Sequence, residues 1–217
     1  MAWPKELVLV RHAESEGNRL SVEDRAAFEC ATHAYGITAR GRRQAEITGA
    51  WLRDVYPDGF DVYYTSYYRR ARETMRLLFP DANIYEDARL AEAQRGIYHS
   101  YTREQVDEHF PLERLRKTCE GLYHYRPPGG ENWADVELRI HSFLGTIARD
   151  MGEKRVLIVV HGHWLLLFQR LIDHFSIEEA VRRYGQGVAE NASVMRYGGA
   201  SGHLILDEYR VPWSGLL

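Results

Sequence analysis

The chain is poor in several features that mark particular classes of protein. It has only two cysteines, Cys30 and Cys119, far apart and without metal-type spacing, so we expect reduced thiols, as in the cytoplasm, and no metal site built on them. No apolar run approaches the roughly 20 residues that cross a bilayer. The first dozen residues carry charges where a secretion signal would be apolar. We therefore expect a cytoplasmic protein that has no membrane partner.

A large excess of charge of one sign is missing as well. The 217 residues carry a formal net charge of −3, with 27% charged and 45% hydrophobic residues. This near-neutral balance argues against a nucleic-acid partner held by bulk electrostatics. No repeat, low-complexity segment or linker interrupts the chain, so residues 1–217 are predicted to form a single domain with a sizeable core. No pattern indicates an oligomeric state.

Short apolar runs alternate with helical patterns along the chain. Strands are predicted at residues 6–10, 61–65, 82–85, 156–160, 193–197 and 203–209, and helices at 38–56, 68–79, 133–151 and 163–175. This alternation is typical of an α/β three-layer sandwich, with a mostly parallel central sheet and helices on both faces. Glycines between the last two strands favour an antiparallel pair at one edge. The weaker patterns at 20–35 and 98–128 are expected to form helical insertions above the sheet, where specificity would reside.

Two histidines follow the two most apolar strand signals. Residues 7–10 run into Arg11-His12, and residues 156–160 run into His161-Gly162. A buried strand cannot accommodate an arginine or an imidazole at low cost, so each run should end where its polar residue meets a cleft. Ligands of open α/β sheets bind outside the carboxyl ends of the strands. We therefore predict that His12 and His161 form two walls of one site.

The residue types at these strand ends suit phosphoryl chemistry. The Arg11 guanidinium offers a planar fork of donors to two phosphoryl oxygens. The neutral imidazole of His12 can attack phosphorus through whichever ring nitrogen is free. A second imidazole at His161 would offset charge on the transferred group. Each residue taken alone also fits a solvated strand end or a satisfied core histidine.

A basic segment and a glutamate extend this interpretation. The helix that follows strand 61–65 would point free N–H groups toward the cleft, which favours an anion there. Its position in the first turn predicts that Arg70 faces inward, whereas Arg69 and Arg72 are expected at the surface. Glu92 could hold a proton for a leaving oxygen if its surroundings are dry. A solvated loop glutamate is the ordinary alternative.

Taken together, these motifs resemble those of the histidine phosphatase superfamily, the phosphoglycerate mutase-like proteins. The family's opening Arg-His-Gly signature matches Arg11-His12-Ala13, with Asn18 at its asparagine position, and its arginine motif matches Ser66, Arg70, Ala71 and Thr74. Its Leu-x-Glu element with a following glycine matches Leu90, Glu92 and Gly96, and its closing His-Gly matches His161-Gly162. Residues 128–132 resemble the family's Pro-Gly-Gly-Glu-Ser turn. Three departures occur. Ala13 stands for glycine, Tyr67-Tyr68 for Pro-Leu or Asp-Leu, and Asn132 for serine.

The resemblance implies a mechanism and a class of substrate. His12 would become a phosphohistidine, while Arg11, Asn18, Arg70 and His161 would hold the phosphoryl oxygens of a small phosphorylated substrate. Glu92 would protonate the departing alcohol and then activate water, and no metal or other cofactor would be required. The segment between Glu92 and His161 is shorter than in the family's cofactor-dependent mutases, which favours a phosphatase.

Three alternatives stay open at this point. The first is a phosphoglycerate mutase-type phosphoryl transferase, and the second is a non-catalytic protein that recognises phosphate with the same fold. The third is a zinc site, because His161 and His163 lie two residues apart. The aromatic residues of the variable segments could line an apolar subsite or could cover the core; they are Tyr98, Tyr101, Phe110, Tyr123 and Tyr125.

Overall fold

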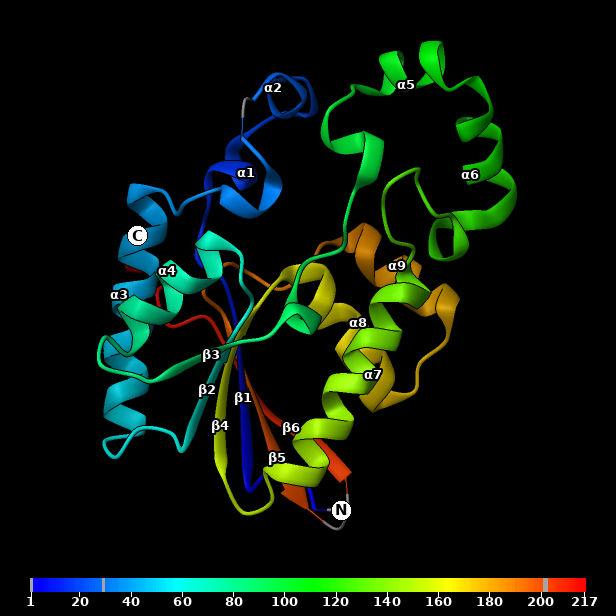
Figure 1. Cartoon of the computed structure of the whole chain (residues 1–217). Helices are drawn as coiled ribbons and strands as arrows, with labels where there is room; N and C mark the ends of the chain where they lie inside the picture. The colour runs from blue at the N-terminus through cyan, green and yellow to red at the C-terminus, as the bar shows by residue number, and fades with distance from the viewer. Residues whose placement is uncertain (1, 29, 201–202) are drawn as a thin grey trace.

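A six-stranded sheet in the order β3-β2-β4-β1-β5-β6 forms the centre of the protein (Figure 1). The computed structural model describes residues 2–28, 30–200 and 203–217. The neighbouring pairs β3-β2, β2-β4 and β4-β1 are parallel, whereas β5 runs antiparallel to both β1 and β6. The strands are β1 (Glu6–Arg11), β2 (Val62–Thr65), β3 (Ile84–Glu86), β4 (Arg155–Val160), β5 (Val194–Ala200) and β6 (His203–Arg210). The mostly parallel sheet with antiparallel pairing at one edge is thus confirmed.

The two central strands, β1 and β4, are buried on both faces. Leu7 and Leu9 of β1 point into one hydrophobic cluster, and Val8 and Val10 point into the other. Side chains alternate along a strand, so a strand covered on both sides reads as an unbroken apolar run. This is why the sequence pattern located these two strands well.

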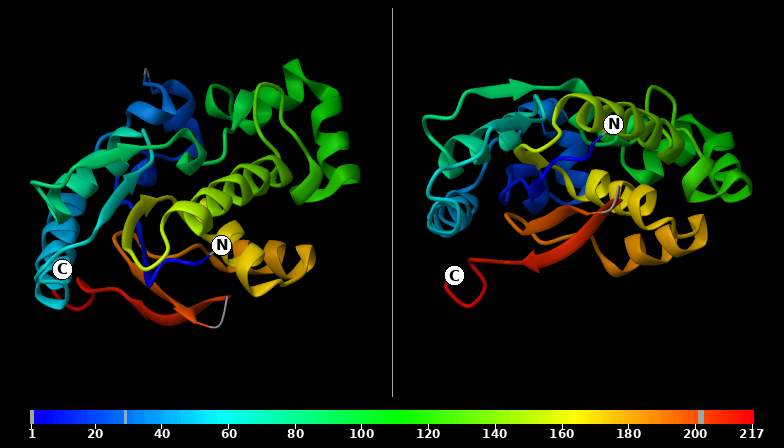
Figure 2. Two further views of the ribbon diagram at one scale, coloured as in Figure 1. Left: turned by 60° about the horizontal axis from the view of Figure 1, so that its bottom comes forward. Right: turned by 90° about the horizontal axis from the view of Figure 1, so that it is seen from below.

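Helices cover both faces of the sheet, which makes the predicted three-layer sandwich (Figure 2). One layer holds α3 (Ala39–Val55) and α4 (Arg69–Leu78), and the other holds α7 (Trp133–Asp150), α8 (Gly162–Asp173) and α9 (Ile177–Gln186). Asn132 caps α7 by accepting a hydrogen bond from the Asp135 backbone N–H at 2.9 Å. Asparagine and serine cap helices about equally well, so this departure from the Pro-Gly-Gly-Glu-Ser turn preserves the start of α7.

Helices form insertions above the carboxyl edge of the sheet at the two predicted places, 20–35 and 98–128, and each begins a few residues earlier than predicted (Figure 1). The first contains α1 (Glu16–Arg19), α2 (Val22–Ala27) and the 3-10 helix η1 (Thr32–Ala34). The second begins after the 3-10 helix η2 (Ala88–Leu90) and contains η3 (Gly96–His99), α5 (Arg103–His109) and α6 (Pro111–His124). Within the described ranges, no helix is long and apolar enough to span a membrane.

Helix α9 was not predicted. The predicted helix 163–175 ends earlier, at Asp173, because His174 adopts a left-handed conformation with φ of 54°. Ser176 then caps a new helix by accepting from the Glu179 backbone N–H at 3.1 Å. The sequence Ser-Ile-Glu-Glu carries this capping signal, but no element was predicted from the sequence between residues 175 and 193.

Candidate active site

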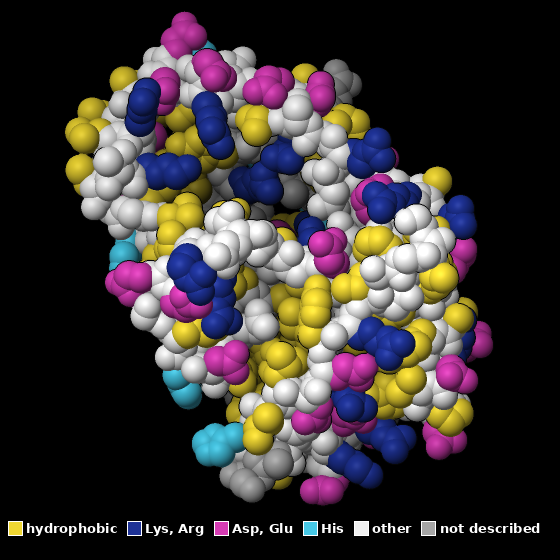
Figure 3. Space-filling model, turned by 180° about the vertical axis from the view of Figure 1, so that it is seen from behind, with side chains coloured by type: hydrophobic (Ala, Val, Ile, Leu, Met, Phe, Trp, Pro, Cys, Tyr) yellow, Lys and Arg dark blue, Asp and Glu magenta, His cyan; other side chains and the backbone are white. Residues whose placement is uncertain are grey.

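A cleft of about 860 Å³ lies where β1 and β4 end, beneath the two insertions. Its lining includes Arg11, His12, Arg70 and Glu92. Lys and Arg side chains gather around this hollow when the molecule is seen from behind (Figure 3). The parallel register of β1 and β4 brings their ends together, with the His12 backbone N–H donating to the Val160 carbonyl at 2.9 Å. The two predicted strand-end histidines therefore start from adjacent points.

His12 is a buried, neutral imidazole whose protonated nitrogen can be assigned. Its Nδ1 lies 2.7 Å from the Ala13 carbonyl, and its Nε2 accepts from Arg70 Nε at 3.1 Å. A carbonyl only accepts, so Nδ1 carries the proton and Nε2 keeps its lone pair. Burial, followed by the charges of Arg70 and Arg11, lowers the pKa of His12 well below its usual 6.5. A nucleophilic nitrogen is therefore present at neutral pH.

His161 lies beside His12, with 5.1 Å between the ring centroids. Its Nε2 is 2.9 Å from Ser66 Oγ, and its Nδ1 accepts from Arg70 Nη2 at 3.2 Å. Burial is the largest cause of a pKa well below 6.5, and the charge of Arg70 adds to it. The ring is thus neutral, with Nε2–H donating to Ser66.

Arg70 joins these two rings, as its predicted inward position requires. From the first turn of α4, it donates to His12, to His161 and, through Nη1, to the Thr32 carbonyl at 2.8 Å. Its guanidinium also lies 4.7 Å from the centre of the Tyr68 ring. Burial lowers its pKa to about 10, although Glu92 opposes the change. No carboxylate among the described residues forms an ion pair with it.

The neighbouring arginines of α4 lie at the surface, as predicted. Arg69 pairs with Glu73 at 2.7 Å, and Arg72 pairs with Glu86 at 3.6 Å. Helical geometry explains why Arg70 is buried while Arg69 and Arg72 are exposed, because side chains one and three positions apart on a helix cannot all point toward the end of the sheet.

Arg11 contributes a second guanidinium to the cleft. Its Nη1 donates to the Ala189 carbonyl, and its Nε is buried without a hydrogen-bond partner among the described residues. Burial lowers the pKa of Arg11, while Glu92 and Glu190 act in the opposite direction. A buried N–H that lacks a partner is costly, and an anion that accepted a hydrogen bond from it would relieve that cost.

Glu92 faces the same cleft from the chain that follows η2. Its Oε1 accepts from the Ala93 backbone N–H at 3.0 Å, and its Oε2 accepts from the His163 backbone N–H at 3.4 Å, in the first turn of α8. Glu92 is also the strongest opposing charge on both Arg11 and Arg70. The carboxylate and the two guanidiniums therefore share one electrostatic environment.

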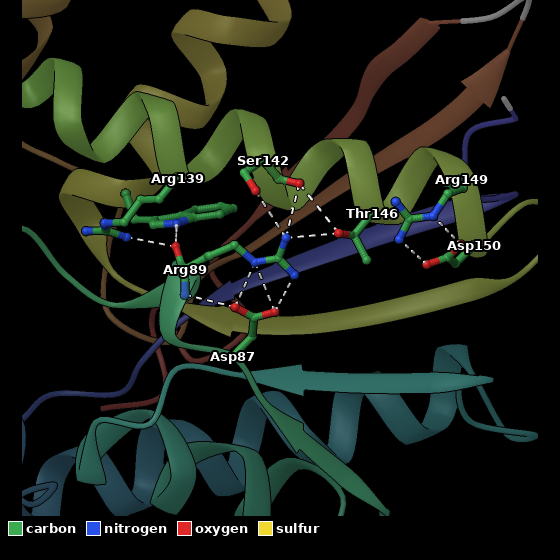
Figure 4. A network of polar contacts seen from close by, with 8 residues as sticks. Asp87, Arg89, Arg139, Ser142, Thr146, Arg149 and Asp150 are labelled. Carbon is green, nitrogen blue, oxygen red and sulfur yellow. Dashed lines mark hydrogen bonds and ion pairs between the residues drawn. The ribbon is translucent and has the colours of Figure 1, made fainter.

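A polar network fixes the chain three residues before Glu92 (Figure 4). The Arg89 carbonyl accepts from Arg139 Nη1 at 2.8 Å and from Trp164 Nε1 at 3.0 Å, and the Arg89 side chain binds Asp87 at 2.6 Å. Burial disfavours the ionised Asp87 carboxyl, but hydrogen bonds from Arg89 outweigh it and lower the pKa of Asp87. The loop that carries Glu92 is thereby attached to α7 and α8.

Asn18 lies on α1 at the rim of the cleft, and its side chain is exposed. Its Oδ1 accepts from the Ser15 backbone N–H at 2.9 Å and lies 3.4 Å from Asn191 Nδ2. With the carbonyl oxygen engaged in this way, the amide nitrogen is the group that remains to donate to a ligand.

Sequence reasoning missed several residues that support this site. Asn191 Nδ2 donates to the His12 carbonyl at 2.9 Å, and the Thr32 carbonyl holds Arg70. Neither residue lies in a periodic segment, so no sequence signal marked them. Ser66 was assigned to a motif without a role, and it proves to be the partner of His161.

The variable aromatic residues divide between the two predicted uses. Tyr98 and Tyr125 line the cleft. Tyr123 instead belongs to the main hydrophobic core. Tyr101 and Phe110 pack against each other with centroids 5.6 Å apart.

The structure does not favour the zinc alternative. His161 contacts Ser66 and Arg70, whereas His163 packs against Trp133 and Tyr184, with ring centroids 4.5 and 5.1 Å away. In the part of the chain that the structure describes, no group of three or more His, Cys, Asp or Glu residues is arranged to hold a metal ion.

Comparison with known proteins establishes the family. The model of the histidine phosphatase superfamily (branch 1) matches residues 7–211. The chain belongs to this family. It is 32% identical over 199 residues to a phosphoglycerate mutase-like protein of Arabidopsis thaliana. This match covers 81% of the chain but only 60% of the Arabidopsis protein. It is 31% identical over 180 residues to a 2,3-bisphosphoglycerate-dependent phosphoglycerate mutase of Gloeobacter violaceus, covering 80% of this chain and 78% of the relative.

Solved structures of the family share the fold. A putative alpha-ribazole-5'-P phosphatase from Escherichia coli superposes with a TM-score of 0.77 at 20% identity, covering 95% of this chain and 96% of the other. A mycobacterial glucosyl-3-phosphoglycerate phosphatase gives a TM-score of 0.71 at 22% identity, covering 94% and 97%. Identities this low show the fold alone. The relatives include both phosphatases and mutases.

Proposed function

We propose that the protein is a phosphomonoester hydrolase that works through a phosphohistidine on His12, with Glu92 as proton donor. One observation carries the proposal: a neutral imidazole, with its proton fixed on Nδ1, holds its Nε2 lone pair against a buried guanidinium in a cleft. Arg11 and Arg70 supply the positive charge that a phosphoryl transition state needs. Asn18 and His161 complete the set of groups around the phosphoryl oxygens, and His161 must turn its Nε2–H away from Ser66 to donate there.

The reaction takes place in two steps. In the first, His12 Nε2 attacks phosphorus, the bond from phosphorus to the ester oxygen breaks, and Glu92 gives its proton to the departing alcohol. In the second, a water oxygen attacks the phosphohistidine while Glu92 takes the water proton. The N–P bond breaks, and inorganic phosphate leaves with His12 restored. Arg70 must turn from His12 Nε2 toward the phosphoryl oxygens before the first attack. The single lone pair of Nε2 cannot accept the hydrogen bond from Arg70 and attack phosphorus at the same time.

The test is the variant His12→Ala, assayed with a generic aryl phosphate. We expect the rate of hydrolysis to fall by at least about a thousandfold, as when a nucleophile is removed from other enzymes, with the circular dichroism spectrum unchanged. Wild-type protein quenched during turnover should carry phosphate in an acid-labile, base-stable linkage. Wild-type activity in the variant, or a protein-bound phosphate that survives acid, contradicts the proposal. A wild type that binds phosphometabolites without hydrolysing any would favour the non-catalytic alternative.

Mutase-type transfer is a second candidate, because the cleft carries more cations than a single phosphoryl group needs. Arg25, Arg95, Arg103 and Lys117 also line it, and among the described residues no carboxylate forms an ion pair with any of them. A second anionic group could neutralise these charges. Turnover in the presence of phosphoglycerates distinguishes the two functions, since a mutase retains the phosphoryl group in the acceptor and a phosphatase releases inorganic phosphate.

A further inference from the structure

Three aromatic side chains from three helices meet in the wall of the cleft. Trp133 of α7, His163 of α8 and Tyr184 of α9 have ring centroids 4.5, 5.1 and 5.2 Å apart in their three pairings. All three line the cleft, and Tyr184 is 40% exposed. We call these three residues the aromatic patch. The proposed chemistry uses none of their side chains.

The aromatic patch lies beside the proposed proton donor. The His163 backbone N–H donates to Glu92 Oε2 at 3.4 Å, and the Glu92 charge acts on the His163 ring. A general acid must come within hydrogen-bond distance of the oxygen that it protonates. The alcohol bonded to that oxygen therefore departs on the Glu92 side of the phosphoryl group, next to the aromatic patch.

His163 makes the aromatic patch a surface for flat groups rather than a second charged site. Burial lowers the pKa of its imidazole, so the ring is neutral at neutral pH. Its Nε2 is buried and has no hydrogen-bond partner among the described residues. The three rings meet at angles of 48° to 70°, an arrangement that leaves the exposed Tyr184 ring able to stack on, or meet edge-on, a further ring.

We propose that the aromatic patch is the leaving-group subsite, and that the substrate is a phosphomonoester of an alcohol with an aromatic or heteroaromatic ring close to the ester oxygen. This inference rests on the proposed function, because Glu92 as proton donor places the alcohol there. A small hydrophilic alcohol would leave the Tyr184 ring in water. A saturated ring would bury apolar area against Tyr184 but could not form a stacked or edge-to-face aromatic pair with it.

The test compares benzyl phosphate, cyclohexylmethyl phosphate and methyl phosphate. Their leaving groups are all unactivated primary alkoxides, so differences in kcat/KM report recognition more than intrinsic reactivity. Wild-type protein should prefer benzyl over cyclohexylmethyl phosphate by about two- to tenfold, the range of an aromatic pair beyond its buried area. The variant Tyr184→Leu keeps an apolar side chain but removes the ring, and it should abolish this preference. Tyr85→Leu removes an exposed tyrosine of β3 outside the cleft and should retain the preference.

Binding of phosphonates separates this inference from the proposed function. Benzylphosphonate, whose C–P bond cannot be hydrolysed, should bind more tightly than cyclohexylmethylphosphonate by calorimetry, and Tyr184→Leu should remove that difference. A binding preference without hydrolysis of benzyl phosphate would support the subsite and refute the phosphatase. Hydrolysis with equal kcat/KM for the two ring substrates, or with the same preference in Tyr184→Leu, would overturn the subsite and leave the phosphatase standing.

Discussion

Replacing Arg70 with methionine should make the protein more stable while removing its activity. Arg70 is only 5% exposed, and its guanidinium has no carboxylate partner in the described structure. Burial lowers its pKa from 12.5 to about 10, a difference equivalent to about 3 kcal/mol against the charged form. The folded state thus holds this proton less tightly than the unfolded chain does. The buried charge therefore lowers the free energy of unfolding by the full amount below about pH 10, and this destabilisation decreases only above that pH.

Methionine keeps the length and apolar contacts of the side chain and removes the charge. The change also leaves the Thr32 carbonyl and one nitrogen of each of the two histidines without a hydrogen-bond donor. This loss reduces the expected stabilisation by about 1 kcal/mol or more. We expect a net stabilisation of about 1–2 kcal/mol, or roughly 2–8 °C in Tm for a chain of this size. The value of kcat should fall by about 10³ to 10⁵, as it does when phosphoryl-transfer enzymes lack their catalytic arginine.

Urea unfolding and thermal unfolding at pH 7, with and without inorganic phosphate, measure this directly. Phosphate should stabilise the wild type, because an anion that binds the folded state offsets the buried charge, and it should have much less effect on Arg70→Met. Arg69→Met, which removes a neighbouring exposed arginine, is the matched control and should retain activity. A variant Arg70→Met that is less stable than the wild type would refute the reasoning, since the buried guanidinium would then be a net support of the fold.

Two further predictions follow from the same structure. Burial and two arginines lower the pKa of His12 well below 6.5, so His12 should stay neutral as the pH falls through 6.5. The value of kcat/KM, corrected for ionisation of the substrate, should therefore not decrease with a midpoint at pH 6.5. A pH–rate profile with that midpoint contradicts a neutral His12 nucleophile. A Cβ at Gly41 would lie 2.0 Å from the Glu14 carbonyl oxygen, so Gly41→Ala should destabilise the protein by about 1–3 kcal/mol in urea and lower kcat by displacing the loop after His12. Gly145 of α7 has open space around it, so Gly145→Ala should instead add about 0.5–1 kcal/mol, and equal effects of the two changes would refute the steric argument.

The sequence predicted well whatever depends on burial and periodicity. The runs at 7–10 and 156–160 located β1 and β4, and their parallel register explains why His12 and His161 meet. Helical position correctly separated Arg70 from Arg69. The roles assigned to Arg11, His12, Asn18, Arg70, Glu92 and His161, and the single-domain organisation, stay predictions.

What the sequence could not predict are contacts between segments that are distant along the chain. Asn191 reaches the His12 carbonyl, and Thr32 reaches Arg70, through the paths of irregular loops. Such contacts depend on how the chain turns in space, and no local pattern records that. The meeting of Trp133, His163 and Tyr184 belongs to the same class, because it depends on how three helices pack, one of which had not been predicted.

The hydrogen bond from Arg70 Nε to His12 Nε2 has a consequence for the proposed nucleophile before any substrate binds. While it persists, the only lone pair of the ring is engaged, so a small alkylating or acylating reagent that enters the cleft meets a nitrogen that is already occupied. An anion that draws the guanidinium aside uncovers the nitrogen at the moment when a phosphoryl group is in place. In the proposed mechanism the nucleophilic atom is thus protected from adventitious chemistry until a substrate removes the protection.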